Sequence, residues 1–245
     1  MPQSFEDLDR DQLLPFVIDA FRRTLMHYAL WFREAERELG LDGAFEAEER
    51  AFERGLEIQM RRIGKAAGFE VEGGLPSALR SRSREELLAL FDALSVNWLV
   101  NDGVWFQAVE ETHDMSTAKV CNDRAWSGYS PFEARRIKKL LDLPEAGGLE
   151  ALALALKFRL YAQINEQTFE WEDDGALVFR MVNCRVQAAR KRKGLQDYPC
   201  KSGGLVEYNT FAATIDSRIE TECIACPPDE HPEGWFCAWR FRLPD

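Results

Sequence analysis

Long apolar runs are missing from this sequence. No stretch of its 245 residues approaches the ~20 consecutive apolar residues that a membrane-spanning helix needs. We also expect no secretory leader, because residues 1–7 (MPQSFED) are acidic where a leader is basic and then apolar. Positive charge is scarce: 31 Lys and Arg face 42 Asp and Glu, and the net charge of −11 disfavours general binding to nucleic-acid phosphates. We therefore expect a cytoplasmic protein that binds neither membranes nor nucleic acid.

The common catalytic signatures are also absent. The sequence contains no P-loop, no G-x-S-x-G and no convincing G-x-G-x-x-G, and three histidines give no Ser–His–Asp assignment. Glu110 and His113 form an E-x-x-H, a spacing used by di-iron bundles, but no second copy accompanies it. His27 is interpreted as an ordinary helix residue. His231 is interpreted as a solvated loop residue and a minor ligand candidate.

The amino-terminal part is predicted to be helical. Apolar residues recur every three or four positions over residues 17–39 and again over 45–67, which lines one face of each helix. Pro15 suits the first turn of the first helix and Gly40 ends it. We expect the two helices to pack as an antiparallel pair.

Two capping boxes predict further helix starts. Residues 83–86 (SREE) open a helix through Leu94, and residues 130–133 (SPFE) open one that reaches Leu141. An Ala/Leu-rich helix is predicted over 149–160, whereas 98–109 has no clear assignment.

The carboxy-terminal part changes to a period of two. Alternating residues on both sides of Asp173-Asp174-Gly175 predict a hairpin, and the runs 219–223 and 235–243 predict a second one. Short helices are predicted over 185–193 and 204–213. The sequence therefore predicts one α+β domain, 1–245, in which a mainly helical part (1–165) packs on a small antiparallel sheet with a Cys-rich carboxy-terminal hairpin (166–245).

Five of the six cysteines lie in the last quarter of the chain. Cys121 stands apart as a bystander, and the others are Cys184, Cys200, Cys223, Cys226 and Cys237. In a reducing compartment such a cluster indicates metal ligands, redox thiols or small apolar core residues rather than a disulfide framework. Cys237 lies on the same face of the predicted strand as Trp235, Trp239 and Phe241, where a free cysteine can serve as a small apolar residue.

The spacing nevertheless favours a metal site. Cys223 and Cys226 form a C-x-x-C, in which one backbone turn offers two thiolates to one ion. We expect Cys200, Cys223, Cys226 and Cys237 to be the ligands, with Cys184 as the substitute. Closed sulfur coordination favours zinc, whereas Cys226-Pro227 resembles the end of some iron–sulfur motifs.

One positive patch accompanies the cysteines. Arg185 and residues 190–193 (RKRK) make a basic helix that could hold an anionic ligand or simply face solvent. Glu220 and Glu222 are alternative oxygen ligands, with a solvated strand face as the simpler role.

The cysteine-bearing segments also resemble a known group of proteins. Tyr198-Pro199-Cys200-Lys201, residues 223–229 (CIACPPD) and 237–241 (CAWRF), together with 27–32 (HYALWF), resemble an uncharacterised family of bacterial "cytosolic proteins" found mostly in anaerobes. The carboxy-terminal hairpin is more distantly similar to the L-2-amino-thiazoline-4-carboxylic acid hydrolase-like family and to 4-vinyl-reductase-type sensory domains. These resemblances imply a small-molecule pocket, cysteine-bound zinc or a hydrolytic role.

Three functions follow as hypotheses. The leading one is a metal- or iron–sulfur-binding protein with a small-molecule pocket between the amino-terminal helices and the sheet. The second is a hydrolase of a small cyclic amide-like substrate, in which a metal activates water. The third is an interaction module whose thiols only pack. The substrate, the metal and the oligomeric state are left open.

Overall fold

The computed structural model describes residues 3–192, 194 and 197–244, so Lys193 of the expected basic helix lies outside the described residues. The chain divides into two compact units, residues 1–82 and 83–245, and each is described by itself. The expectation of one domain over 1–245 stays a prediction.

The first unit is a helical hairpin followed by a small ribbon. Helix α1 (Arg10–Ala67) is interrupted at Gly40, whose φ of 73° and ψ of 171° are non-helical, so the two helices predicted on either side of Gly40 are present. Asp9 caps the first of them, and Pro15 therefore lies inside the helix rather than in its first turn. After the short 3-10 helix η1 (Phe5–Asp7) and α1 come β1 (Val71–Glu72), β2 (Leu75–Pro76) and α2 (Ser77–Arg80).

The two arms of α1 pair only near their bend. Phe32 and Phe45 pack there with ring centroids 5.7 Å apart. Farther along the first arm, the periodic apolar residues Val17 and Leu25 are 56% and 73% exposed. The predicted antiparallel packing therefore holds for a part of the arms.

The second unit begins with long helices. Helix α3 (Arg84–Thr112) starts at the predicted Ser83 cap and continues through the unassigned stretch 98–109. Helix α4 (Met115–Leu140) starts at an Asp114 cap, so the helix start predicted at Ser130 is wrong. The Ser130 hydroxyl instead donates to the backbone oxygen of Glu207, because both lie in the core. The predicted helix 149–160 divides into α5 (Gly148–Leu156) and α6 (Leu160–Ile164).

The rest of this unit builds a four-stranded antiparallel sheet. Strands β3 (Glu166–Trp171) and β4 (Leu177–Asn183) form the first predicted hairpin, and β5 (Glu220–Ala225) pairs with β6 (Cys237–Arg242) as the second. Because β4 pairs with β6, the order is β3-β4-β6-β5. Helices α7 (Arg185–Arg192) and α8 (Lys201–Ile215) fall between the hairpins. The α+β prediction is confirmed.

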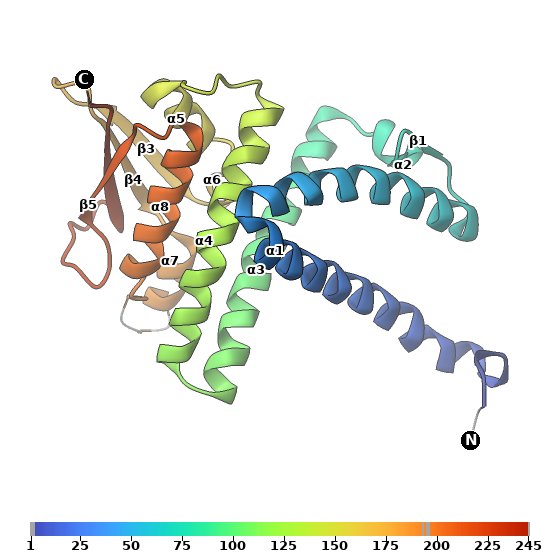
Figure 1. Ribbon diagram of the computed structural model, residues 1–245. Helices are drawn as coiled ribbons and strands as arrows, with labels where there is room; N and C mark the ends of the chain where they lie inside the picture. Colours follow the sequence, from blue (N-terminus) through green and yellow to red (C-terminus); the bar gives the residue numbers. More distant parts are fainter. Residues whose placement is uncertain (1–2, 193, 195–196, 245) are drawn as a thin grey trace. The chain divides into compact units, whose positions relative to one another are not determined.

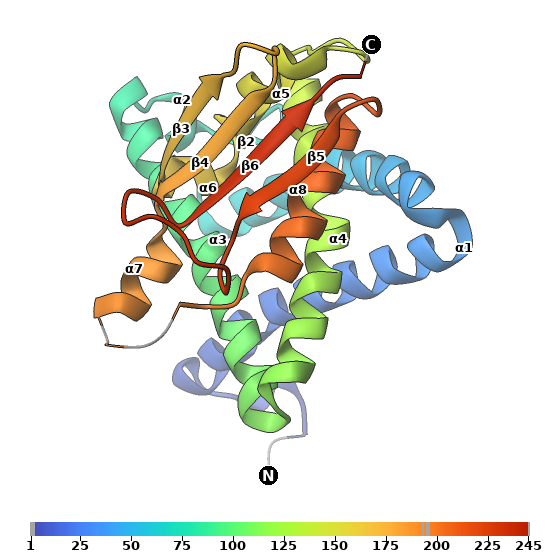
Figure 2. The ribbon, with the colours of Figure 1, turned by 90° about the vertical axis from the view of Figure 1, so that its left-hand side faces the viewer.

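Helix α8 lies between the sheet and α4, with α3 beyond α4 (Figures 1 and 2). Inward residues of β4 and β6, including Phe179 and Trp239, are fully buried against α8, and Tyr208 stacks on Trp239 at 4.7 Å. On the opposite sheet face, Arg180 and Arg240 pair with Glu170 and Glu172. This packing holds α8 against strands β4 and β6 and thereby fixes where the helix begins relative to the sheet.

Among the described residues, α3 is long and apolar enough to cross a membrane by length and composition. This is weak support for a membrane segment, because core helices of other proteins pass the same test. The expectation that the protein does not bind membranes stays a prediction.

Close approach of α8 to the sheet requires glycine at Gly204. A Cβ at this position would lie 2.6 Å from Cζ2 of Trp239, a ring that is itself fully buried. We expect Gly204→Ala to lower the free energy of unfolding by about 1–3 kcal/mol through overpacking. Gly128→Ala is the control, because a Cβ at this α4 position meets nothing within 4 Å. Chemical denaturation measures both, and equal stability of the two variants would contradict the packing argument.

Candidate functional site

A cavity of about 360 Å³ lies in the second unit, at the end of α8 where the helix begins. Helices α3, α4, α6, α7 and α8 and the loop before α8 contribute its walls, whereas the sequence predicted a pocket between the amino-terminal helices and the sheet. Its aromatic residues are Phe106, Trp126, Tyr161 and Tyr198. Two of the predicted ligands, Cys184 and Cys200, also line it.

Cys200 and Cys226 are in direct contact. Cys200 is the residue that precedes α8, and Cys226 follows the last residue of β5. Their sulfur atoms lie 3.6 Å apart, and the Cys226 thiol is also hydrogen-bonded to Cys237, the first residue of β6. We call Cys200, Cys226 and Cys237 the thiol cluster.

Gln187 holds the loop that carries Cys200. The buried Gln187 side chain accepts a hydrogen bond from the Tyr198 backbone N–H (2.8 Å) and donates to the Tyr198 carbonyl oxygen (2.8 Å). The same Nε2 lies 3.4 Å from the Cys200 sulfur. Helix α7, predicted as a basic helix, therefore contributes a buried amide to the site.

The thiols of the cluster differ in their acidity. The hydrogen bond with Cys226 lowers the pKa of Cys200, and the contact with Gln187 acts in the same direction. Hydrogen bonds to Cys200 and Cys237 raise the pKa of Cys226. Of the two thiols, Cys200 is therefore the more acidic.

The other two predicted ligands lie near the cluster but outside these contacts. Burial raises the pKa of Cys223 and of Cys184 to about 11 each, and both interact electrostatically with Cys200 and Cys237. The Cys184 sulfur contacts the Tyr161 hydroxyl at 3.5 Å. Cys121 is exposed on α4. Within the described parts of the chain, no three His, Cys, Asp or Glu side chains are grouped so that they could hold a metal ion as they stand.

Sequence reasoning missed a buried ion-pair network behind the cavity. Arg159 is 1% exposed, and its Nε donates to Glu133 (2.8 Å) while its Nη2 lies 2.6 Å from Glu207. Glu207 also lines the cavity. No spacing rule reveals this network, because Glu133 carries the signature of a helix cap and Arg159 lies in the break between α5 and α6.

The remaining candidates occupy separate places. His113 ends α3 beside Thr112, and Glu110 lines the cavity without it. His231 is 16% exposed in its side chain and lies 3.0 Å from Asp197, so the prediction of a solvated residue is wrong. Of the basic helix, Arg190 lines the cavity, whereas Lys191 and Arg192 are exposed.

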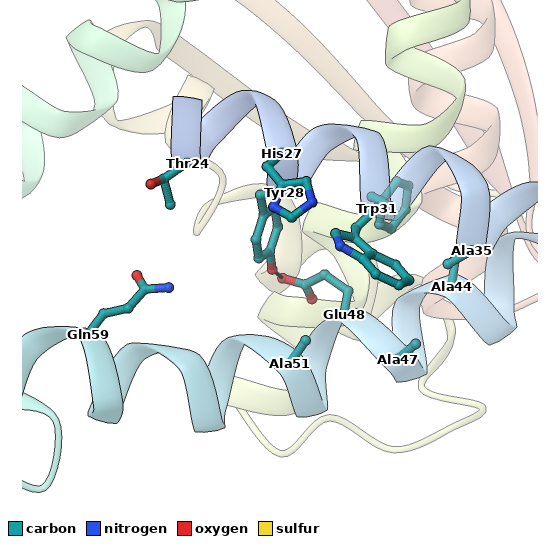
Figure 3. A pocket seen from close by; sticks show the side chains of 11 residues that line it. Thr24, His27, Tyr28, Trp31, Ala35, Ala44, Ala47, Glu48, Ala51 and Gln59 are labelled. Carbon is teal, nitrogen blue, oxygen red and sulfur yellow. Dashed lines mark hydrogen bonds between the residues drawn. The ribbon is translucent and has the colours of Figure 1, made fainter. Parts of the chain in front are cut away.

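The first unit carries a groove of its own, also of about 360 Å³, between the arms of α1 (Figure 3). Its lining is mostly apolar and includes Trp31 and four alanines. The Tyr28 hydroxyl donates to Glu48 at 2.5 Å, which occupies that carboxylate. Thr24, His27 and Gln59 add polar side chains to this lining, whereas the predicted cysteine ligands all lie in the second unit.

The buried network yields a stability prediction. We expect Arg159→Met to lower the free energy of unfolding by about 3–5 kcal/mol near pH 8, because two buried carboxylates lose their counter-ion. Burial holds the pKa of Glu207 above its usual value, so its protonated form favours folding at low pH and this contribution is lost as pH rises. The deficit of the variant should therefore shrink toward pH 5.

The control for this experiment is Arg180→Met, which removes a partly exposed arginine paired with Glu170 on the other sheet face. This variant should change stability by about 1 kcal/mol or less at every pH. Denaturation curves at pH 5 and pH 8 measure both variants. A deficit of Arg159→Met that is independent of pH would contradict the charge argument.

Comparison with known proteins gives a family but no activity. A family model described as a family of unknown function (DUF6125) matches residues 6–82 and 79–243. No curated protein and no solved structure matches the chain.

Proposed function

The chain belongs to this family of unknown function. We propose that its second unit binds a small organic molecule beside a metal ion or iron–sulfur cluster, which the late cysteines hold. The observation that carries the proposal is the position of Cys200. This residue lines the 360 Å³ cavity and also contacts Cys226, so the cavity and the thiol cluster share a wall.

The cavity has the character of a ligand pocket. Its volume lies in the range of small-molecule sites, and apolar aromatic walls surround a few polar groups, as such sites require. Gln187 and Glu207 are buried and tied to neighbouring elements, so these polar groups are held in place before a ligand arrives.

The thiol cluster fits a thiophilic metal in its donor atoms. Zinc–sulfur bonds of about 2.3 Å place two tetrahedral ligands about 3.8 Å apart, and the Cys200–Cys226 separation of 3.6 Å is close to this. The Gln187 amide beside the Cys200 sulfur is the kind of outer hydrogen bond that supports a thiolate ligand. A complete shell requires Cys223 or Cys184 to turn toward the cluster. The metal would then join the start of α8 to the β5–β6 hairpin.

The hydrolase reading is the second candidate, and the lowered pKa of Cys200 favours it. A Cys200 thiolate on the cavity wall can attack the carbon of a cyclic amide-like bond. The C–S bond forms as the C–N bond breaks, and the leaving nitrogen takes a proton, which the Cys226 thiol carries. Water then cleaves the thioester: its oxygen bonds to the acyl carbon as the C–S bond breaks, one of its protons restores the Cys226 thiol, and Cys200 leaves as the thiolate. This agrees with the distant resemblance to the thiazoline-carboxylate hydrolase-like family.

Metal analysis separates the two readings. We expect the full chain, purified without oxygen, to contain one zinc ion or one iron–sulfur cluster per chain by elemental analysis and absorption. Cys226→Ser should lose most of this metal, because Cys226 is the middle member of the cluster. Cys121→Ser is the matched control and should retain it, because Cys121 is exposed elsewhere.

Alkylation by iodoacetamide tests the alternative outcome, in which the protein contains no metal. A metal-bound Cys200 should be protected until a chelator is added. Metal-free wild-type protein in which Cys200 reacts faster than Cys121 would overturn the metal proposal and favour the nucleophilic role.

A further inference from the structure

We propose that the ligand of the α8 cavity is a protonated amine on a flat apolar body. This inference rests on the proposed function, since it needs the cavity to bind a small molecule. It follows from the balance of charge, the unsatisfied acceptor atoms and the shape of the walls.

Negative charge exceeds positive charge around the cavity. Asp102, Glu110 and Glu207 line it, against Lys119 and Arg190. Lys119 is already paired with Asp123 at 2.9 Å, outside the lining.

The network behind the wall does not correct this excess. Arg159 is shared between Glu207 and Glu133, so one guanidinium faces two buried carboxylates. Together these side chains contribute five acids and three bases, which leaves two negative charges in excess in a largely buried region. A bound cation compensates this excess, whereas a bound anion increases it.

Two oxygen atoms in the wall lack a hydrogen bond among the described residues. The Tyr198 hydroxyl is buried without a partner. Oε1 of Glu207 lies 2.6 Å from Nη2 of Arg159 as an ion pair without hydrogen-bond geometry, and the Nη1 and Nη2 donors of Arg159 also lack a hydrogen bond there. Asp102, Asp123 and Glu110 all act electrostatically on the Tyr198 hydroxyl. An ammonium group carries three donors and no acceptor, which is the complement of such a set of oxygens.

The pKa values of two carboxyl groups in the wall are also shifted. Burial raises the pKa of Asp102, whose partner is the Asn122 amide at 3.1 Å, and burial also raises the pKa of Glu207. Burial therefore disfavours the charged form of both carboxyls, and a bound cation would favour that form.

The walls define the body of the ligand. Trp126 and Tyr161 lie on the cavity from α4 and α6, and Phe106 packs edge-on against Tyr198 at 5.3 Å. Flat aromatic surfaces favour a flat apolar group and also attract a cation over their faces. An arylalkylamine combines both properties.

Three probes with one ring system and different charges test the proposal. Calorimetry on the full-length chain compares tryptamine, 3-methylindole and indole-3-acetate at pH 7.5. We expect tryptamine to bind about tenfold more tightly than the neutral ring, and the carboxylate to bind weakest. A change of about tenfold is what one charge-assisted hydrogen bond contributes.

Variants identify the groups that select the charge. Asp102→Asn keeps the shape of the side chain and should weaken tryptamine binding about tenfold while leaving 3-methylindole unchanged. Glu207→Gln should act in the same direction, and Asp102→Asn keeps the test valid if this core variant fails to fold. Glu222→Gln on β5 is the control and should change neither affinity, because its partner Arg240 lies on the opposite sheet face.

The outcomes separate the two proposals. Equal affinity for all three rings, or preference for the carboxylate, would overturn the amine assignment and leave the cavity as a small-molecule site. Binding of none of the three would overturn the amine assignment and the small-molecule function together. An amine preference that survives Asp102→Asn and Glu207→Gln would overturn the inference that these two carboxylates select the amine.

Discussion

The ion pair of Arg159 with Glu133 and Glu207 is the constraint on which the second unit depends. A buried guanidinium needs carboxylates at fixed places, and these two come from α4 and α8. Ser130 and Lys138 of α4 hold the same register through hydrogen bonds to backbone oxygens of α8. Glu133 also accepts a hydrogen bond from the Leu160 backbone N–H, so the start of α6 is tied to the same point. Once α8 is fixed along α4, its first residues meet the sheet at Trp239, and Cys200 reaches Cys226. The polar network thus helps to position Cys200, which lies about two helical turns before Glu207.

The sequence predicted those elements whose signals are local, and it failed where tertiary contacts determine the structure. Alternation around Asp173-Asp174-Gly175 predicts a hairpin because turn and strands are local, and the β3–β4 pair confirms it. The capping box at Ser130 failed for the opposite reason. Its serine and glutamate are used across the core, by Glu207 and Arg159, so a local pattern took its meaning from tertiary contacts. Pro131 is accommodated inside α4 in the same place.

The cysteines show how far spacing alone leads. Placing Cys226 at the end of one strand and Cys237 at the start of its neighbour predicts their proximity, and the hydrogen bond between them agrees. Cys200 joins them because α8 is held against the sheet, which no spacing could reveal. Cys184, the substitute ligand, follows β4 and contacts Tyr161. The ligand set of Cys200, Cys223, Cys226, Cys237 and Cys184 therefore stays a prediction, with three members in mutual contact through Cys226.

The thiol cluster and the carboxylates of the cavity belong to one electrostatic system. The pKa of Cys200 is lowered, and its thiolate form would add a negative charge to a wall that already carries Asp102, Glu110 and Glu207. A thiophilic cation on the sulfurs and an ammonium at the carboxylates would each lower the cost that the other group's charges impose at this distance. The two ligands should therefore not compete for the cavity, since they use different atoms. If both proposals hold, each bound cation would reduce the excess of negative charge, so each ligand should bind more tightly in the presence of the other.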